Sequence, residues 1–360
     1  MRFAIVGCGV IGKQHVRTIG TVADAELACV VDIEPERAAA FAHDYGIPGL
    51  TDLDKALARD DIDAVAVCTP SGRHADIAVP ALAAGKHVIV EKPLEITPDA
   101  AERIADAAWR TGKTVTVISQ RRFAPINRFM RTAIERGDLG HITSGSAAMY
   151  WWRSPGYYAS AGWRGTWSLD GGGALMNQGI HTIDLLTWLM GKPVEVTAYA
   201  ATVAHPDLEV EDTAIAAVRY ETGALASIHG TTAAFPGTIS TVGIFGDRGS
   251  MQTTNDRLEY FYSAPAQEAA AAAYGGGGGN QADEVREREG LDGEAQETPT
   301  ADSVKQPAKR TGHSAQYEDF IDAVTTGREP FVTVADNTRT LGVIWGIYES
   351  ARTGMPVRIG

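Results

Sequence analysis

The chain contains 360 residues, 44% of them hydrophobic, and is long enough for two domains with separate cores. The formal net charge of −13 argues against a nucleic-acid partner, and no apolar stretch approaches membrane-spanning length. The first predicted strand leaves no room for a signal peptide, and Cys8, Cys29 and Cys68 lack metal-ligand spacing. We therefore expect a cytoplasmic protein without a bound metal.

The first predicted strand, residues 2–6, is apolar and leads directly into a glycine motif followed by a helical stretch. This order and the G-x-G-x-x-G spacing are what a dinucleotide site requires. Gly7 allows the tight turn, Gly9 lets the backbone approach a pyrophosphate, and Gly12 lets the helix pack against the strand. The start of the helix also offers free N–H groups to phosphate. The candidate cofactor-binding residues here are Gly7, Gly9, Val10, Ile11 and Gly12.

A second apolar run, residues 27–31, ends in an acidic residue, Asp32. A carboxylate at this distance from the glycine motif accepts hydrogen bonds from both ribose hydroxyls of adenosine and repels a 2′-phosphate. Asp32 therefore favours NAD over NADP, although Arg37 lies nearby in the sequence. The alternative is an acidic residue that ends a strand and caps the next helix.

Strands and helices alternate as far as about residue 120, which is typical of a doubly wound parallel sheet. Helices are expected at 35–45, 52–58, 73–84 and 97–111, and further strands at 64–68, 87–90 and 114–118. Doubly wound folds bind ligands at the carboxyl edge of such strands. The candidate cofactor-binding residues that follow these strands are Thr69, Pro70, His74, Glu91, Lys92 and Gln120.

Lys92 directly follows the strand at 87–90 and precedes Pro93. A lysine at this edge can hydrogen-bond a substrate hydroxyl and favour its ionisation as hydride leaves. Nearby positive charge, including an oxidised nicotinamide, lowers the pKa of such a lysine. The alternative is a surface lysine paired with Glu91.

From residue 123 the pattern changes to long strands with alternating polar and apolar residues, which predict a half-covered antiparallel sheet. Strands are expected at 141–152, 194–203, 212–220, 225–232, 238–245 and 357–359, and helices at 127–135, 172–190, 313–326 and 336–353. We expect one domain over 1–122 and a second over 123–360. Residues 263–310 have alanine and glycine runs and mixed charge, which predict a flexible insertion. The alternative is a lid over the active site.

The helix at 172–190 carries Asn177, His181 and Asp184 at positions i, i+4 and i+7, which lie on one helix face. The glycines at 171–173 before it either let backbone approach a ligand or form a turn. A histidine here can exchange a proton near neutral pH, although a lone helical histidine is more often structural.

Six aromatic residues gather in the loop at 151–167: Trp151, Trp152, Tyr157, Tyr158, Trp163 and Trp167. Aromatic faces suit the C–H faces of sugar rings, and tryptophan can cover a nicotinamide. The alternative is a loop folded on its own hydrophobic cluster. The candidate substrate-binding residues are Lys92, Arg122, Tyr157, Asn177, His181 and Asp184, and Trp163 and Arg164 join the candidate cofactor contacts.

In combination these motifs are specific. The chain resembles the Gfo/Idh/MocA oxidoreductases, which include glucose–fructose oxidoreductase and inositol 2-dehydrogenase, over nearly all residues outside 263–310. The motifs that carry the resemblance are Gly7-x-Gly9-x-x-Gly12, Thr69-Pro70 with His74, Glu91-Lys92-Pro93, and Gly171-Gly172-Gly173 followed by His181-x-x-Asp184.

The resemblance implies an N-terminal NAD-binding Rossmann domain and a C-terminal α/β domain whose open, mostly antiparallel sheet forms the interface of a homodimer or homotetramer. It implies that Lys92 touches the reacting hydroxyl and that His181 is the acid/base. Asp184 would hold a substrate hydroxyl or orient the site. Many sugar and cyclitol dehydrogenases of this family have aspartate where this chain has Asn177. An amide cannot stabilise an imidazolium with negative charge, so Lys92 would carry more of the proton transfer.

These observations predict an NAD-dependent dehydrogenase acting on a secondary hydroxyl of a sugar, sugar derivative or cyclitol. For this reaction we expect the Lys92 ammonium and the His181 imidazole to converge beside the nicotinamide. One alternative is an epimerase, lyase or glycosidase that oxidises its substrate transiently with tightly held NAD. Another is a non-catalytic, NAD-binding regulatory protein.

Overall fold

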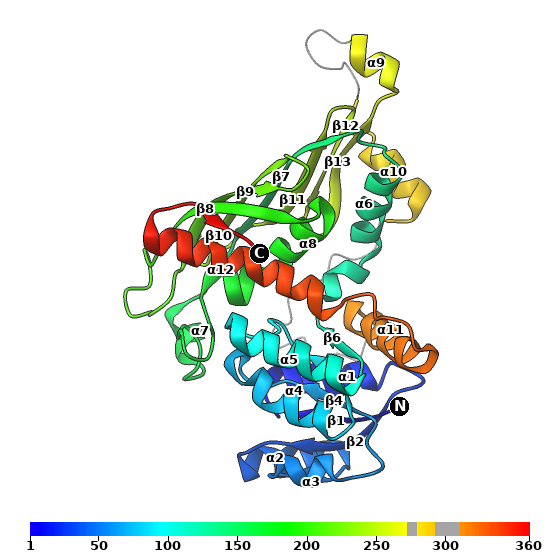
Figure 1. The fold of residues 1–360 in the computed structure, drawn as a ribbon, viewed down its shortest axis with the longest axis vertical. Coiled ribbons are helices and arrows are strands. Elements are labelled where there is room, and N and C mark those ends of the chain that lie inside the picture. The colour runs from blue at the N-terminus through cyan, green and yellow to red at the C-terminus, as the bar shows by residue number, and fades with distance from the viewer. Residues whose placement is uncertain (272–278, 292–309) are drawn as a thin grey trace. The chain divides into compact units, whose positions relative to one another are not determined.

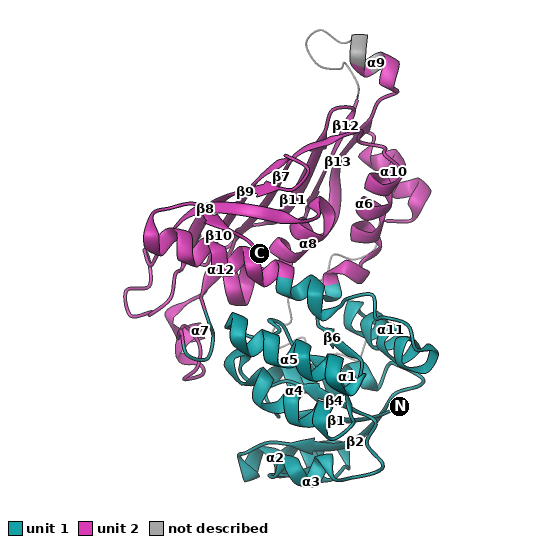
Figure 2. Cartoon of the chain, in the orientation of Figure 1, with its two compact units in different colours: residues 1–120, 168–171, 298–338 teal, residues 121–167, 172–297, 339–360 magenta. Residues whose placement is uncertain are grey.

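The computed structural model describes residues 1–271, 279–291 and 310–360 (Figure 1). The chain folds into two compact units (Figure 2). Among the described residues, unit 1 contains 1–120, 168–171 and 310–338, and unit 2 contains 121–167, 172–271, 279–291 and 339–360. None of the described helices has the length and apolar composition needed to cross a membrane.

Unit 1 is built on a six-stranded, all-parallel sheet with the strand order β3-β2-β1-β4-β5-β6. Its strands are β1 (Arg2–Val6), β2 (Glu26–Val31), β3 (Gly49–Leu50), β4 (Ala64–Val67), β5 (His87–Val90) and β6 (Val115–Val117). In the central strands β1 and β4, residues 3–6 and 64–67 are apolar and buried, because helices cover a parallel sheet on both faces. The order reverses at β1, so the carboxyl edge of β1 and β4 is the position where such sheets bind ligands. The predicted doubly wound parallel sheet is confirmed.

The helices of unit 1 are α1 (Val10–Ile19), α2 (Pro35–Tyr45), α3 (Leu53–Leu57), η1 (Ser71–Arg73), α4 (His74–Ala83), α5 (Pro98–Thr111) and α11 (Gly312–Thr326). The helix α11 belongs to this unit although it lies near the end of the chain. Its Tyr317 and Phe320 are fully buried in the same core as Phe3, with 5.2 Å between the ring centroids of Phe3 and Tyr317. The division of the chain therefore differs from the single boundary expected after residue 122.

Unit 2 contains an eight-stranded sheet with the order β13-β12-β11-β7-β10-β9-β8-β14, in which only the β7–β10 pair is parallel. Its strands are β7 (Ile142–Tyr150), β8 (Pro193–Ala201), β9 (Thr213–Tyr220), β10 (Leu225–Thr231), β11 (Ser240–Gly246), β12 (Gly249–Thr254), β13 (Arg257–Ser263) and β14 (Val357–Arg358). Buried and exposed residues alternate along β8, β9 and β10, as expected for a sheet covered on one face. The predicted open, mostly antiparallel sheet is confirmed.

The remaining elements are η2 (Gln120–Phe123), α6 (Pro125–Glu135), α7 (Pro155–Ala159), η3 (Ala174–Gly179), α8 (Ile180–Met190), α9 (Ala266–Ala271), α10 (Ala282–Glu289) and α12 (Val334–Thr353). The helix α8 packs on β7 and β11 of the sheet. The helix α10 lies within the predicted flexible insertion, yet Ala282 and Val285 are buried and Arg286 donates to the Leu258 carbonyl of β13. Residues 279–291 are therefore an ordered part of unit 2, and residues 272–278 and 292–309 of that prediction lie outside the described residues.

Candidate active site

The glycine motif forms a tight turn between β1 and α1. Gly7 has φ = +107°, and a Cβ placed there would lie 2.5 Å from the Cys68 carbonyl oxygen. A Cβ on Gly12 would lie 2.1 Å from the Gly7 carbonyl oxygen, whereas a Cβ on Gly9 would have no atom within 4 Å. Gly7 and Gly12 are thus required by the fold, and Gly9 faces open space at the start of α1.

The start of α1 suits an anion. Among the described residues, no side chain caps this end of the helix, and its first turn contains no acidic residue. The first N–H groups of a helix carry partial positive charge and bind phosphate when no side chain satisfies them. Val10, at the first position of α1, is exposed. The open space at Gly9 and the uncapped helix start together fit the pyrophosphate of a dinucleotide.

Asp32 lies at the end of β2, next to the glycine turn. Its Oδ2 accepts the Cys8 N–H at 2.8 Å, and its Oδ1 accepts the Glu34 N–H at 2.9 Å. The side chain is 7% exposed, so its orientation is fixed by the backbone. Each oxygen keeps a second lone pair, and these can accept the two ribose hydroxyls of an adenosine.

Buried polar side chains hold the loop that carries Lys92. Lys92 itself is half-buried, and its peptide bond to Pro93 is cis. The Pro93 carbonyl lies 2.7 Å from Nδ1 of His74, and the Leu94 N–H donates to Oδ1 of Asn337 at 2.9 Å. Burial lowers the pKa of His74, although its hydrogen bonds to the Pro93 and Thr69 carbonyls and the nearby carboxylates oppose the shift. The orientation of the Lys92 backbone is therefore strongly constrained.

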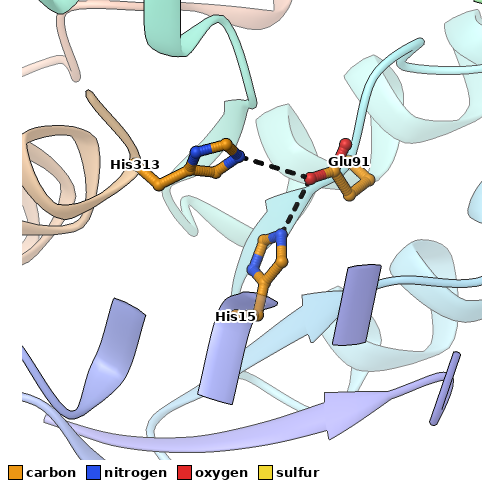
Figure 3. Close-up of side chains that lie close together, drawn as sticks. All are labelled: His15, Glu91 and His313. Atoms are coloured by element: carbon orange, nitrogen blue, oxygen red, sulfur yellow. Dashed lines mark hydrogen bonds and ion pairs between the residues drawn. The ribbon is translucent and has the colours of Figure 1, made fainter. Parts of the chain in front are cut away.

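The residue before Lys92 is also fixed. Oε2 of Glu91 accepts the Lys92 N–H at 3.0 Å, and Oε1 lies 2.8 Å from Nε2 of His15 and 3.8 Å from Nε2 of His313 (Figure 3). Burial alone raises the pKa of Glu91, but the ring nitrogens of His15 and His313 bring it well below its usual value. Glu91 is therefore a carboxylate held inside unit 1.

The same cluster must be considered as a metal site. Among the described residues, the potential ligand atoms of His15, Glu91 and His313 all lie within 4.8 Å of one another. Two ligands bound to one tetrahedral zinc ion at about 2.0 Å would lie about 3.3 Å apart. The 2.8 Å separation between His15 and Glu91 is instead that of a direct hydrogen bond. The geometry is that of a hydrogen-bonded cluster.

In unit 2, the segment before α8 is not a regular α-helix. Residues Ala174–Gly179 form a π-helix, and α8 begins at Ile180. Asn177 lies in the π-helix and His181 in α8, so the expected single α-helical face does not extend to Asn177. Short π-helical segments occur frequently at functional sites.

Asn177 and His181 are half-buried, whereas every other residue from Gly171 to Thr187 is buried. The Asn177 Oδ1 accepts from Nε2 of Gln178 at 3.1 Å. A core helix that exposes an amide and an imidazole on neighbouring turns presents polar groups toward solvent or a ligand. This selective exposure is the strongest local indication that His181 is more than a packing residue.

The start of this helical segment is held by a buried carboxyl group, Glu211. Its oxygens accept the N–H groups of Gly173 at 2.9 Å and Leu175 at 2.8 Å, and the Tyr348 hydroxyl at 3.0 Å. Burial raises the pKa of Glu211 to about 7, although these hydrogen bonds oppose the shift. A Cβ on Gly173 would lie 1.9 Å from the Glu211 carbonyl oxygen, so only glycine fits there.

Asp184 and Arg122 form a pair with each other. Nε and Nη2 of Arg122 donate to the two carboxylate oxygens at 2.8 and 2.7 Å, and Thr340 donates to Oδ1 at 3.0 Å. Both side chains are buried. The structure thus brings together two residues that the sequence analysis considered as separate substrate contacts.

The aromatic loop reaches the π-helix through Tyr157. Its hydroxyl accepts from Nη1 of Arg164 at 2.5 Å and from Nε2 of Gln178 at 2.8 Å. The Arg164 guanidinium lies 4.4 Å from the centroid of the Tyr157 ring and 4.7 Å from that of Trp163. Tyr157, Trp163 and Arg164 therefore form one cluster in unit 2, and Gln178 connects it to Asn177.

Gln120, a candidate cofactor contact, is half-buried in η2, at the end of unit 1.

Sequence reasoning missed several residues that support the candidate site. In unit 1 these are His15, Glu95, Asn337, His313 and Tyr317, and in unit 2 they are Gln178, Glu211 and Tyr348. His15 lies one turn after the glycine motif on a helix already predicted, and Gln178 and Glu95 bond their sequence neighbours Asn177 and Ile96. The remaining residues contact their partners across long sequence separations.

Family models and relatives agree with this geometry. Residues 1–119 match an oxidoreductase family with an NAD-binding Rossmann fold, and residues 127–252 match the GFO/IDH/MocA C-terminal domain. The 4-carboxy-2-hydroxymuconate-6-semialdehyde dehydrogenase of Sphingobium is 33% identical over 229 residues, which are 63% of this chain and 71% of that protein. The inositol 2-dehydrogenase of Rhizobium meliloti is 30% identical over 71% of this chain and 76% of its own length.

The chain belongs to the Gfo/Idh/MocA oxidoreductase family. Among solved structures, it is similar to the WlbA dehydrogenase from Bordetella pertussis, crystallised with NADH and UDP-GlcNAcA. The two share 30% identity and a TM-score of 0.84 over 100% of this chain and 98% of that one. The resemblance seen in the sequence is thus confirmed. As a Gfo/Idh/MocA protein the chain is an oxidoreductase, and NAD is its cofactor.

Proposed function

We propose that this Gfo/Idh/MocA protein is an NAD-dependent dehydrogenase that oxidises a secondary hydroxyl of a sugar, sugar derivative or cyclitol. The observation that carries the proposal is the fixed loop around Lys92, which buried side chains hold from both sides of the lysine. The inositol 2-dehydrogenase relatives and the WlbA neighbour support this substrate class. Because WlbA was crystallised with a UDP-sugar acid, nucleotide sugars belong among the candidates.

The residues of unit 1 that would hold the cofactor are those of the glycine turn, Asp32 and the Lys92 loop. The backbone at Gly9 and the start of α1 would bind the pyrophosphate, and Asp32 the adenosine ribose. When bound, NAD⁺ supplies the hydride acceptor at nicotinamide C4. Lys92 would hydrogen-bond the reacting hydroxyl and stabilise the negative charge that develops on its oxygen.

His181 would accept the hydroxyl proton or return it in the reverse direction. Asn177 can orient a ligand or the imidazole through its amide but adds no negative charge. Asp184 would act by orienting α8, because its two oxygens already accept hydrogen bonds from Arg122 and Thr340. Tyr157, Trp163 and Arg164 would form a wall for the sugar or the nicotinamide.

The first experiment is a substrate screen. Purified protein with NAD⁺ is assayed for NADH absorbance against inositols, pyranosides, anhydrosugars, sugar acids and UDP-sugars. We expect NADH formation with at least one class. Product formation without net NADH would instead indicate transient oxidation, and silence across the panel with NAD binding intact would favour a regulatory protein.

Substitutions then test the assigned roles. On a confirmed substrate, Lys92→Ala and His181→Ala should each lower kcat by about 10²- to 10⁴-fold. If the two side chains serve one proton transfer, the double variant should lose less than the product of the two single losses. A Lys92→Ala enzyme that keeps near-wild-type turnover would refute this assignment.

We also propose that the exposed face of the unit 2 sheet binds a second copy of the chain, giving a homodimer or homotetramer. Tyr199 on β8 and Ile215 on β9 lie directly opposite each other in the sheet and are 86% and 52% exposed. Leu225, at the start of β10 and opposite Arg219, is 56% exposed. Exposed large apolar side chains on a sheet face are typical of an interface. The three buried free thiols at Cys8, Cys29 and Cys68 support a cytoplasmic location.

A further inference from the structure

We propose that His15 is a positioning residue for Lys92 and acts through the carboxylate of Glu91 (Figure 3). The inference rests on the proposed function, in which Lys92 hydrogen-bonds the reacting hydroxyl. His15 belongs to the cofactor-binding helix α1, and Glu91 is the residue directly before Lys92.

Glu91 connects the two residues through its separate oxygens. Oε1 accepts from Nε2 of His15 at 2.8 Å, and Oε2 accepts from the backbone N–H of Lys92 at 3.0 Å. His15 is fully buried and Glu91 is 4% exposed. A buried carboxylate is costly without donors. Nε2 of His313 lies 3.8 Å from the same oxygen, so His15 at 2.8 Å is the nearer of the two histidines and has the stronger influence on the Glu91 rotamer. The direction of the Lys92 peptide therefore depends on the position of His15.

The His15 ring is itself oriented by Tyr317 of α11, whose hydroxyl lies 2.7 Å from Nδ1. Burial raises the pKa of Tyr317 well above its usual value, so the phenol keeps its proton. The Glu91 carboxylate can only accept, so Nε2 of His15 carries the hydrogen toward it. Tyr317 thus holds the ring at Nδ1, and the ring donates to Glu91 through Nε2.

This link complements the other contacts of the loop. His74, Asn337 and Glu95 hold the backbone of Pro93, Leu94 and Ile96, all of which follow Lys92. Glu91 directly precedes Lys92 and accepts its N–H, and His15 holds the Glu91 side chain. Since α1 also presents its N-terminus at the glycine turn, one hydrogen bond ties the helix that would bind the pyrophosphate to the peptide that carries the lysine.

The test uses three substitutions at His15 in the NAD-bound enzyme. A Gln side chain places its amide nitrogen near the position of Nε2, whereas Asn places it near that of Nδ1. His15→Gln should therefore keep a donor for Glu91, and His15→Asn and His15→Ala should lose it. On a confirmed substrate we expect Ala and Asn to lower kcat by about 10- to 100-fold with little change in the KM for NAD. We expect Gln to restore most of the rate.

Tyr317→Phe is the matched control. It removes a buried hydrogen bond of the same ring but leaves the donor to Glu91, so it should lower the thermal midpoint without the loss of kcat seen in His15→Ala. If Tyr317→Phe and His15→Ala lose rate and stability in the same proportion, His15 is only a structural residue and the proposal is wrong.

A readout independent of turnover separates this inference from the proposed function. Lysines are reductively ¹³C-methylated, which keeps their charge, and the Lys92 resonance is identified by its loss in Lys92→Arg. With NAD bound, the resonance should shift in His15→Ala and His15→Asn and return in His15→Gln. An unchanged resonance in His15→Ala overturns the link even if the enzyme proves to be a dehydrogenase. A shifted and rescued resonance supports it even if no substrate is found.

Discussion

Arg122 donates two hydrogen bonds, at 2.7 and 2.8 Å, to the two carboxylate oxygens of Asp184. Both side chains are buried in unit 2. A buried arginine and aspartate paired in this way stabilise each other, and removing one of them is costly for the other. Asp184 therefore fixes α8, the helix that carries His181, through its contacts with the protein.

The pair makes a stability prediction. Asp184→Asn should lower the free energy of unfolding by about 3–5 kcal/mol because it removes the carboxylate that pairs with the buried Arg122 guanidinium. Replacing both residues, as in Arg122→Met with Asp184→Leu, should restore much of this loss. Urea unfolding measures both. Glu349→Gln is the control, because it breaks only the exposed pair with Arg352 and should leave the free energy of unfolding unchanged. An Asp184→Asn protein with wild-type stability would refute this explanation.

Glu211 predicts a stability that falls with rising pH. Its pKa is about 7 in the folded protein against an ordinary value of 4.5, so between these values the folded state binds more protons than the unfolded state. Stability should therefore decrease as pH rises from about 4.5 to 7, by about 3 kcal/mol in total. Glu211→Gln should remove this component, and unfolding curves at pH 5 and pH 8 measure the difference between the two proteins.

The control for Glu211 lies two residues earlier. Glu209 is exposed, and its Oε2 accepts the Trp167 N–H at the surface. Glu209→Gln should keep the wild-type pH dependence. Equal pH dependence in wild type and Glu211→Gln would show that Glu211 does not titrate in this range.

The local parts of the fold could be predicted from the sequence because each depends on neighbouring residues. The strand at 2–6, the glycine turn and Asp32 lie within one short stretch, and glycine spacing and apolar runs report on them directly. The hairpin of β12 and β13 was not predicted, although its turn residues Asn255 and Asp256 adopt positive φ, which these residue types tolerate.

The non-local parts could not be predicted. The helix at 313–326 was predicted, but its membership of unit 1 depends on Tyr317 and Phe320 packing against Phe3, about 300 residues away along the chain. The spacing of Asn177 and His181 assumed 3.6 residues per turn, and the π-helix does not follow that period. The Arg122–Asp184 pair joins residues from separate elements, so neither residue alone indicates the other.

The exposed sheet face predicts an oligomer that a single charge disrupts. Tyr199→Lys places an ammonium on this face and should convert the homo-oligomer to smaller species, because an unpaired buried charge is costly at an interface. Light scattering coupled to size-exclusion chromatography measures the mass. Trp109→Lys, at an equally exposed site on α5 of unit 1, should leave the mass unchanged. A monomeric wild-type protein would contradict the proposed interface.

Asp32 predicts the cofactor preference. Asp32→Ser should weaken NAD binding by about 10- to 100-fold, because hydrogen bonds to a charged group contribute about 1.5–3 kcal/mol. It should weaken NADP binding less, since the repulsion of the 2′-phosphate is also removed. Titration calorimetry with both cofactors measures the ratio. Glu34→Gln is the control: it changes a nearby exposed charge and should alter the ratio of NAD to NADP affinity little. If Asp32→Ser also leaves this ratio unchanged, Asp32 does not bind the ribose.

Gly9 and Gly12 separate binding from folding within one motif. A Cβ at Gly12 would lie 2.1 Å from the Gly7 carbonyl oxygen, whereas one at Gly9 would have no atom within 4 Å. Gly12→Ala should therefore lower the thermal midpoint, because backbone must move to admit the methyl group. Gly9→Ala should fold normally but bind NAD more weakly, since its methyl group occupies the space that the pyrophosphate needs. Thermal unfolding with and without NAD measures both effects, and a Gly9→Ala protein that NAD stabilises as much as wild type would place the pyrophosphate elsewhere.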